Sequence, residues 1–168
     1  MLTAVILAER DPENLAATLG ALVPAVVEGV LGDAVVVARL ADPAVANIAE
    51  IAGASLAVAP GDADPWREGG RLARRDWLLC LRAGDVPADG WMRAVDHFLV
   101  ASARGRRPLG RFSRPGSGLA GSFSRVVERM AGTRSVRPGD LVQRSWLDAH
   151  DRARVRPLPI GARIERVS

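Results

Sequence analysis

Short apolar runs alternate with amphipathic segments over the first hundred residues of the chain. Four runs are apolar at every position but Thr3 and rich in leucine, valine or isoleucine: residues 2–8, 34–38, 56–59 and 77–81. Continuous apolar runs of this length are typical of strands that are buried on both faces, as in a parallel sheet.

The segments between these runs carry helix-start signals. Asp11-Pro12 and Asp42-Pro43 each place an aspartate at the N-cap and a proline at the first helical position. Asp89-Gly90 opens a third helix with an apolar face, and a short arginine-rich helix is expected between the polar stretch 62–70 and the fourth strand. This alternation predicts an α/β protein with a mostly parallel central sheet and helices on both faces.

Ligands of such sheets bind beyond the carboxyl ends of the strands, so the residues that follow each strand are the candidate site positions. These are residues 9–11, 39–42, 60–64 and 82–85. They include arginines and aspartates after almost every strand, which favours a charged ligand.

The sequence changes character after residue 103. We expect a Gly/Pro/Arg/Ser loop over residues 104–118, an amphipathic helix over 119–130, and short strands at 141–142 and 155–158. We therefore interpret residues 1–103 as an α/β half and residues 104–168 as a basic extension of the same domain.

Charge separates these two parts of the chain. Residues 1–100 carry a net charge of −6, whereas residues 101–168 carry +10. A basic segment of this kind favours a polyanionic partner, and an anionic membrane surface that contacts residues 104–137 is one candidate. Nucleic acid is the weakest candidate, because only Phe112 and Phe123 supply aromatic rings in the loop and helix and no nucleic-acid module is recognisable.

The chain has neither a run of about 20 apolar residues nor the basic start of a secretory signal. We therefore expect a cytoplasmic protein, with a location peripheral to the inner membrane as a variant of that expectation.

Several chemistries are excluded by residues that the chain lacks. All 23 basic residues are arginine and there is no tyrosine, which excludes a P-loop lysine, a Schiff-base lysine and a phenolic acid or base. Cys80 is the single cysteine, and His97 and His150 are too far apart for a His-Glu-x-x-His zinc site. Any chemistry must use carboxylates, arginines, backbone amides and hydroxyls.

Three segments together resemble the nucleotide-sugar half of glycosyltransferase family 2, which has the Rossmann-like GT-A fold. They are residues 4–19, 35–53 and 77–91, and the resemblance covers about residues 2–100 in order and spacing. It implies transfer of a sugar from a nucleotide-sugar to an acceptor, for which a lipid-linked molecule is one candidate. It also implies Mg²⁺ or Mn²⁺, which the family holds on the diphosphate with an Asp-x-Asp motif.

The resemblance assigns the donor site residue by residue. Arg10 falls where the family places a side chain against the nucleobase, and Asp42 lies in the loop whose base-binding aspartate is replaced by Ala38. The Asp-x-Asp motif falls on residues 82–84, Arg-Ala-Gly, so Asp85 is the one carboxylate left there as a metal ligand.

An arginine in place of the metal ligands suggests a different way to hold a diphosphate. Arg82, together with Arg67 and Arg71, could neutralise the phosphates directly, because guanidinium groups bind phosphate oxygens in pairs. The alternative is that Arg67 and Arg71 belong to a solvated helix face.

The resemblance also places an acidic general base on a late loop, where Asp148 and Asp151 are the candidates and a surface turn is the alternative. Two functions stay open: a glycosyltransferase, or a non-catalytic relative that binds a nucleotide-sugar or a partner protein after loss of the metal site.

Overall fold

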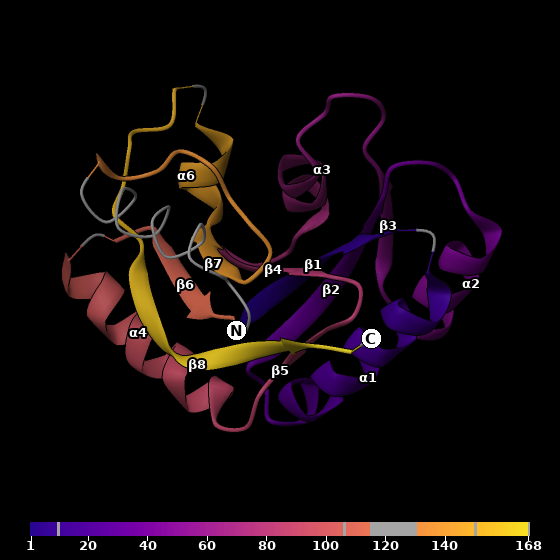
Figure 1. Cartoon of the computed structure of the whole chain (residues 1–168), viewed down its shortest axis with the longest axis horizontal. Helices are drawn as coiled ribbons and strands as arrows, with labels where there is room; N and C mark the ends of the chain where they lie inside the picture. Colours follow the sequence, from indigo (N-terminus) through magenta and orange to yellow (C-terminus); the bar gives the residue numbers. More distant parts are fainter. Residues whose placement is uncertain (10, 106, 115–130, 150, 168) are drawn as a thin grey trace.

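The computed structural model of the chain describes residues 1–9, 11–105, 107–114, 131–149 and 151–167. Within these residues eight strands form one sheet, in the order β3-β2-β1-β4-β7-β6-β8-β5 (Figure 1). The strands are β1 (Leu2–Ala8), β2 (Leu31–Ala38), β3 (Ser55–Val58), β4 (Trp77–Arg82), β5 (Asp85–Pro87), β6 (Leu109–Ser113), β7 (Asp140–Gln143) and β8 (Leu158–Arg166). The described helices are α1 (Pro12–Val27), α2 (Pro43–Ile51), α3 (Pro65–Leu72), α4 (Trp91–Gly105) and α6 (Arg144–Asp148).

The first four strands form the parallel half of the sheet. β1 pairs with β2 and β4, and β2 pairs with β3, all in parallel. All four lie where the apolar runs predict them, and β1 is buried along nearly its whole length. The antiparallel strand β7 then joins this half to β6, β8 and β5.

Helices cover both faces of the sheet, as the sequence predicts. Apolar residues of α1, α2 and α4 pack with Ile6, Val36 and Leu81 on one face. Residues of α3 and α6 pack with Val5 and Val37 on the other. Figure 1 shows the two groups of helices on opposite sides of the strands. The fold class predicted from the alternation of strands and helices is therefore confirmed.

Aspartate caps begin the first three helices. The side chains of Asp11 and Asp42 accept hydrogen bonds from backbone amides of the first turns of α1 and α2, as the Asp-Pro pairs predict. Asp64 caps α3 in the same way, and Pro65 follows it. Helix α3 therefore begins inside the stretch that was expected to be irregular. It ends before Arg74 and Arg75, so the expected limits of this helix are wrong.

The structure corrects the expected organisation of the last third of the chain. Residues 109–113, expected as part of a loop, form β6 between β7 and β8. Leu109 and Phe112 are buried, and Gly110 lies so close to Phe98 and Ile160 that a Cβ atom would be 2.8 Å from each side chain. These contacts join segments far apart in sequence, so a local pattern does not reveal them.

Two other strands are absent from the sequence pattern. β5 has three residues, and β8 alternates buried and exposed positions over nine residues, with only Ile160 and Ile164 fully buried. Of the strand expected at 155–158, Val155 makes a single isolated bridge to Thr133.

The expected amphipathic helix 119–130 lies outside the described residues. Among the helices that are described, none combines the length and the apolar character needed to cross a membrane.

Candidate functional site

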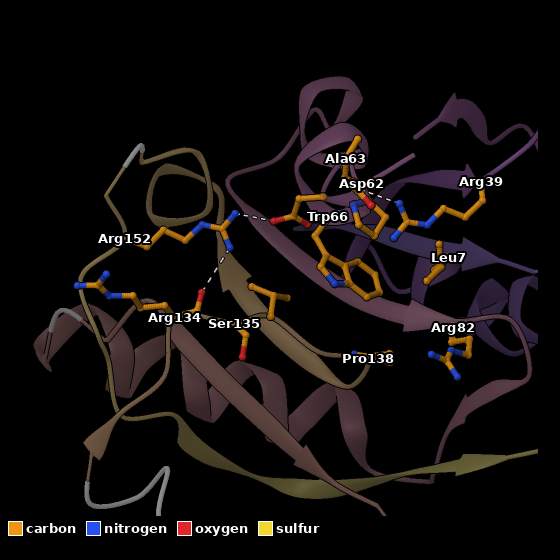
Figure 2. A pocket seen from close by; sticks show the side chains of 13 residues that line it. Leu7, Arg39, Asp62, Ala63, Trp66, Arg82, Arg134, Ser135, Pro138 and Arg152 are labelled. Atoms are coloured by element: carbon orange, nitrogen blue, oxygen red, sulfur yellow. Dashed lines mark hydrogen bonds and ion pairs between the residues drawn. The ribbon is translucent and has the colours of Figure 1, made fainter. Parts of the chain in front are cut away.

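A cavity of about 560 Å³ lies at the carboxyl ends of β1 and β4, where the strand order predicts a ligand site. Figure 2 shows the residues around it, which come from strand ends, the turn before α3 and the segment 134–152. The lining residues are Leu7, Arg39, Asp62, Ala63, Asp64, Pro65, Trp66, Arg82, Arg134, Ser135, Val136, Pro138 and Arg152.

Arg39 directly follows β2 and reaches over the turn that leads into α3. Its Nη1 donates hydrogen bonds to the carbonyl oxygens of Gly61 (3.2 Å) and Ala63 (2.7 Å). Carbonyl groups are neutral, and no carboxylate of the described residues forms an ion pair with Arg39. The guanidinium is thus positioned by backbone carbonyl groups rather than by a carboxylate of the described residues.

Arg82 is the last residue of β4 and lies beside Leu7 of β1 in the register of the sheet. Its Nε is 3.6 Å from Oε1 of Glu9, which is a long ion pair, and this buried nitrogen has no hydrogen-bond partner. The side chain is about one-third exposed, and Figure 2 shows it directed toward the cavity. Because Nε is buried, the terminal nitrogens of Arg82 are the atoms that a ligand in the cavity would contact.

Arg152 forms the opposite wall and is held on several sides. Nη2 donates to Oδ2 of Asp64 (2.6 Å), Nη1 lies 3.4 Å from the carbonyl oxygen of Arg134, and the guanidinium stacks 5.9 Å from the ring centroid of Trp146. Arg134 itself pairs with Asp151 at 3.4 Å, and in Figure 2 its side chain extends away from Arg82. Arg152 thus neutralises Asp64 and ties the C-terminal segment to the start of α3.

Four arginines and two aspartates line the cavity, which leaves its wall with a net charge of +2. The Asp64–Arg152 pair accounts for one charge of each sign, and Arg134 is paired outside. Of the described lining residues this leaves Arg39, Arg82 and Asp62, with a net charge of +1, and Arg82 also has its long ion pair with Glu9. A wall of this composition is suited to an anion with more than one charged oxygen.

A smaller cavity of about 280 Å³ lies between the ends of β1 and β2 and shares Arg39 with the first. Its other walls are mostly small or apolar, with the acidic residues Glu9 and Asp42 at its rim. The two cavities give the carboxyl edge of the sheet a charged compartment beside a more apolar one.

Asp85 is fully buried and its carboxylate is already engaged. Oδ1 accepts from Nη1 of Arg114 at 3.0 Å, and Oδ2 accepts from Nη2 of Arg114 at 2.5 Å and from the backbone amide of Arg82 at 2.7 Å. The guanidinium of Arg114 therefore occupies the side of Asp85 that a metal would need.

The same region fails a broader test for a divalent cation. Nowhere in the described part of the chain do three or more His, Cys, Asp or Glu side chains come together as ligands. Mg²⁺ and Mn²⁺ require several hard oxygen ligands. With Arg82 at the end of β4 and Asp85 bound by Arg114, the residues present do not fit either ion.

The structure separates the other predicted donor-site residues from the larger cavity. Asp42 uses its carboxylate to cap α2 and reaches only the smaller cavity. Arg71 is 71% exposed and pairs with Glu68 at 2.8 Å, which corresponds to the solvated-face alternative. Arg10 lies outside the described residues.

The candidate catalytic carboxylates also lie away from the cavity lining. Asp148 is exposed at the end of α6, and its backbone carbonyl accepts a 2.7 Å hydrogen bond from Nη2 of Arg67. Asp151 is 90% exposed. The structure thus brings Arg67 to Asp148, but through a contact that joins α3 to α6.

Only some of the residues that form the cavity could be predicted from the sequence. Arg39 and the turn 60–64 lie in the stretches that follow predicted strands, although the sequence distinguishes no single residue there as a ligand-binding one. Arg134 and Arg152 give no signal, because they sit among many arginines in a segment whose path depends on contacts with Asp64 and Trp146.

Comparison with known proteins gives a fold and no closer relationship. No protein-family model and no curated protein matches the sequence. Glucosyl-3-phosphoglycerate synthase from Mycobacterium tuberculosis, in complex with Mn²⁺, UDP and phosphoglyceric acid, superposes with a TM-score of 0.64 at 13% identity over 88% of this chain and 57% of that one. This chain has the GT-A fold.

Two further structures share the GT-A fold. A mycobacterial protein matches with a TM-score of 0.65 at 14% identity over 99% of this chain and 65% of its own. S. aureus TarS in complex with UDP-GlcNAc matches with a TM-score of 0.54 at 14% identity over 88% of this chain and 46% of its own. The chain thus spans about half to two-thirds of the length of these GT-A structures.

Proposed function

We propose that this protein binds a nucleotide-sugar at the carboxyl edge of its sheet. The observation that supports this most is the cationic cavity at the ends of β1 and β4, in a GT-A fold whose neighbours include proteins crystallised with UDP, UDP-glucose and UDP-GlcNAc. The cavity combines sufficient volume with the guanidinium groups of Arg39 and Arg82, which suit the charged oxygens of a diphosphate.

The two cavities suggest how the donor is divided between them. The diphosphate takes the charged cavity beside Arg39 and Arg82, and the nucleobase takes the smaller one between β1 and β2. Asp42 lines the smaller cavity, and Arg10, which follows the lining residue Glu9 in the sequence, is the residue whose planar guanidinium would stack on the base. Arg39 contributes to both cavities.

Sugar transfer is the second candidate function, and the shared fold is the observation that favours it. In that case Asp148 or Asp151 is the general base, and the acceptor approaches from the side of residues 131–152. The basic segment 104–137 would then bring the protein to an anionic membrane that carries a lipid-linked acceptor. The non-catalytic alternative needs neither carboxylate.

Calorimetric titration with UDP- and GDP-sugars tests the binding proposal. We expect heat of binding for at least one nucleotide-sugar, and weaker binding as salt is raised, because salt screens the arginines. Absence of heat with every nucleotide-sugar at millimolar concentration would refute the proposal.

Release of free UDP or GDP from the donor that binds, measured with and without lipid-linked acceptors, separates transfer from binding. If transfer occurs, Asp148→Asn or Asp151→Asn abolishes the rate. Asp76→Asn, which alters an exposed carboxylate paired only with Arg144, serves as the matched control and leaves the rate unchanged. Binding without release by the wild-type protein supports the non-catalytic alternative.

A further inference from the structure

Two arginines of the cavity lining, Arg39 and Arg82, lie at the carboxyl edge of the sheet on either side of the end of β1. Ala38 at the end of β2 pairs with Ala8 of β1, and Arg82 at the end of β4 pairs with Leu7 of β1. Arg39 follows Ala38 directly, so Arg39 and Arg82 flank the end of β1 from its two neighbouring strands. Arg82 lies opposite Leu7 and Arg39 lies level with position 9, so two strand spacings and two residues along the strand separate their backbones, roughly 12 Å in all.

We propose that Arg39 and Arg82 bind the two phosphates of a diphosphate from either side of β1 and take the place of a divalent cation. The inference rests on the proposed nucleotide-sugar binding and extends it to a metal-independent mode. The expected ligand is an organic or inorganic diphosphate, whose negative charge is neutralised by guanidinium groups alone.

The availability of the two cations supports this assignment. Arg39 is fixed by two carbonyl oxygens through Nη1 alone, and Arg82 has a long contact to Glu9 and a buried Nε without a hydrogen-bond partner. The protein thus places two guanidinium groups at one cavity; within the described residues Arg39 has no ion pair and Arg82 has the long one to Glu9.

Asp85, the carboxylate nearest to Arg82 in the sequence, is not available to hold a divalent cation on the phosphates. Asp85 cannot accept a cation while Arg114 donates to both of its oxygens. Removal of Arg114 from Asp85 would leave an uncompensated buried carboxylate, which is strongly unfavourable. The Asp85–Arg114 pair therefore keeps the site free of metal and leaves the phosphates to Arg39 and Arg82.

The test is a calorimetric titration of the full chain with UDP-glucose, GDP-mannose and inorganic pyrophosphate, each in EDTA and in MnCl₂. We expect the wild-type protein to bind in EDTA with a Kd that Mn²⁺ leaves essentially unchanged. Arg39→Gln and Arg82→Gln should each weaken binding about ten-fold or more, since each removes a charge-assisted contact.

Arg71→Gln is the matched control, because Arg71 is an exposed arginine that pairs only with Glu68 and lies outside the cavity lining. It should leave the Kd within about two-fold, as expected for an exposed ion pair. Thermal melts of each variant confirm that the fold is retained, and Arg82→Lys, which keeps the charge but loses the planar fork, should fall between wild type and Arg82→Gln.

The outcomes distinguish this inference from the proposed function. Binding of a nucleotide-sugar that requires Mn²⁺, or that is unaffected by Arg39→Gln and Arg82→Gln, overturns the inference and leaves the proposed function standing. Binding of pyrophosphate through these arginines without binding of any nucleotide-sugar overturns the proposed function alone. Absence of binding by all three ligands overturns both.

Discussion

The buried Asp85–Arg114 pair gives a sharp prediction about stability. Asp85 is 0% exposed and accepts three hydrogen bonds, two from Arg114 and one from the backbone amide of Arg82. Asp85→Asn keeps the size of the side chain but removes its charge and turns an NH₂ group toward a donor. Loss of one partner from a buried ion pair typically costs about 3–5 kcal/mol.

The expected loss in this protein is at the lower end of that range. The Arg114 side chain is 31% exposed, so water solvates part of the abandoned guanidinium, and the remaining amide oxygen can still accept one hydrogen bond. We expect the free energy of unfolding to fall by about 3 kcal/mol. For a domain of this size that lowers the Tm by roughly 6–12 °C.

Urea and thermal denaturation measure this change, and Asp76→Asn provides the matched control. Asp76 is 83% exposed and lies 3.4 Å from Arg144, so its replacement should cost about 0–1 kcal/mol. If Asp85→Asn destabilises the protein no more than Asp76→Asn, the structural role of Asp85 is wrong. A rise in the wild-type Tm on addition of Mn²⁺ would equally contradict it, because it would show a metal bound to the folded state.

Three further predictions concern the core, the helices and the basic segment. Burial, followed by the nearby charges of Asp140 and Asp64, raises the pKa of the Cys80 thiol, so native protein should resist thiol reagents at pH 8 until urea unfolds it. The thiol of the unfolded chain ionises first, near pH 8.5, so the free energy of unfolding should fall as pH rises above that value, by up to about 1.4 kcal/mol per pH unit. Cys80→Ala should lack this contribution. Rapid labelling of the native protein would contradict the buried position of Cys80. Gly69→Ala should destabilise the protein by about 1–3 kcal/mol in urea denaturation, because the new Cβ would lie 2.3 Å from the Val5 side chain. Gly20→Ala on the open face of α1 is the control and should stabilise the protein by about 0.5–1 kcal/mol. Equal effects of the two substitutions would disprove the close packing of α3 on the sheet. If residues 104–137 contact membranes, liposome flotation should show that the protein prefers anionic to neutral vesicles, and this preference should disappear at high salt. No preference would refute that contact.

The parallel half of the fold could be predicted because its signals are local. The apolar runs of β1 and β4 and the caps Asp11 and Asp42 depend on neighbouring residues alone, and each has the expected role. The third cap, Asp64, carries the same Asp-Pro signal and sets the true start of α3.

The second half could not be predicted, because long-range contacts define it. β6 is held by Phe98 and Ile160 around Gly110, and Arg111 is bound by the fully buried Asp140. Burial raises the pKa of Asp140, while Arg111 and Arg137 act in the opposite direction. The polar, arginine-containing strand β6 can therefore lie inside the sheet, because Arg111 forms an ion pair with Asp140 of the neighbouring strand β7.

The candidate site was predictable in position and less so in detail. The rule that ligands bind at the carboxyl ends of parallel strands points to residues 39–42, 60–64 and 82–85, and the larger cavity includes Arg39, Asp62, Asp64 and Arg82. The roles proposed for Arg67 and Arg71 required knowledge of where α3 begins and which way its side chains extend. The engagement of Asp85 depends on Arg114, the residue that directly follows β6.

The most direct test of the metal-free diphosphate site is a crystal structure of the protein with UDP-glucose, or another nucleotide-sugar that binds, grown in EDTA. We expect the two phosphates between Arg39 and Arg82, with guanidinium nitrogens within about 3 Å of phosphate oxygens and the Asp85–Arg114 pair intact. Phosphates bound elsewhere, or a complex that forms only when Mn²⁺ displaces Arg114 from Asp85, would contradict it.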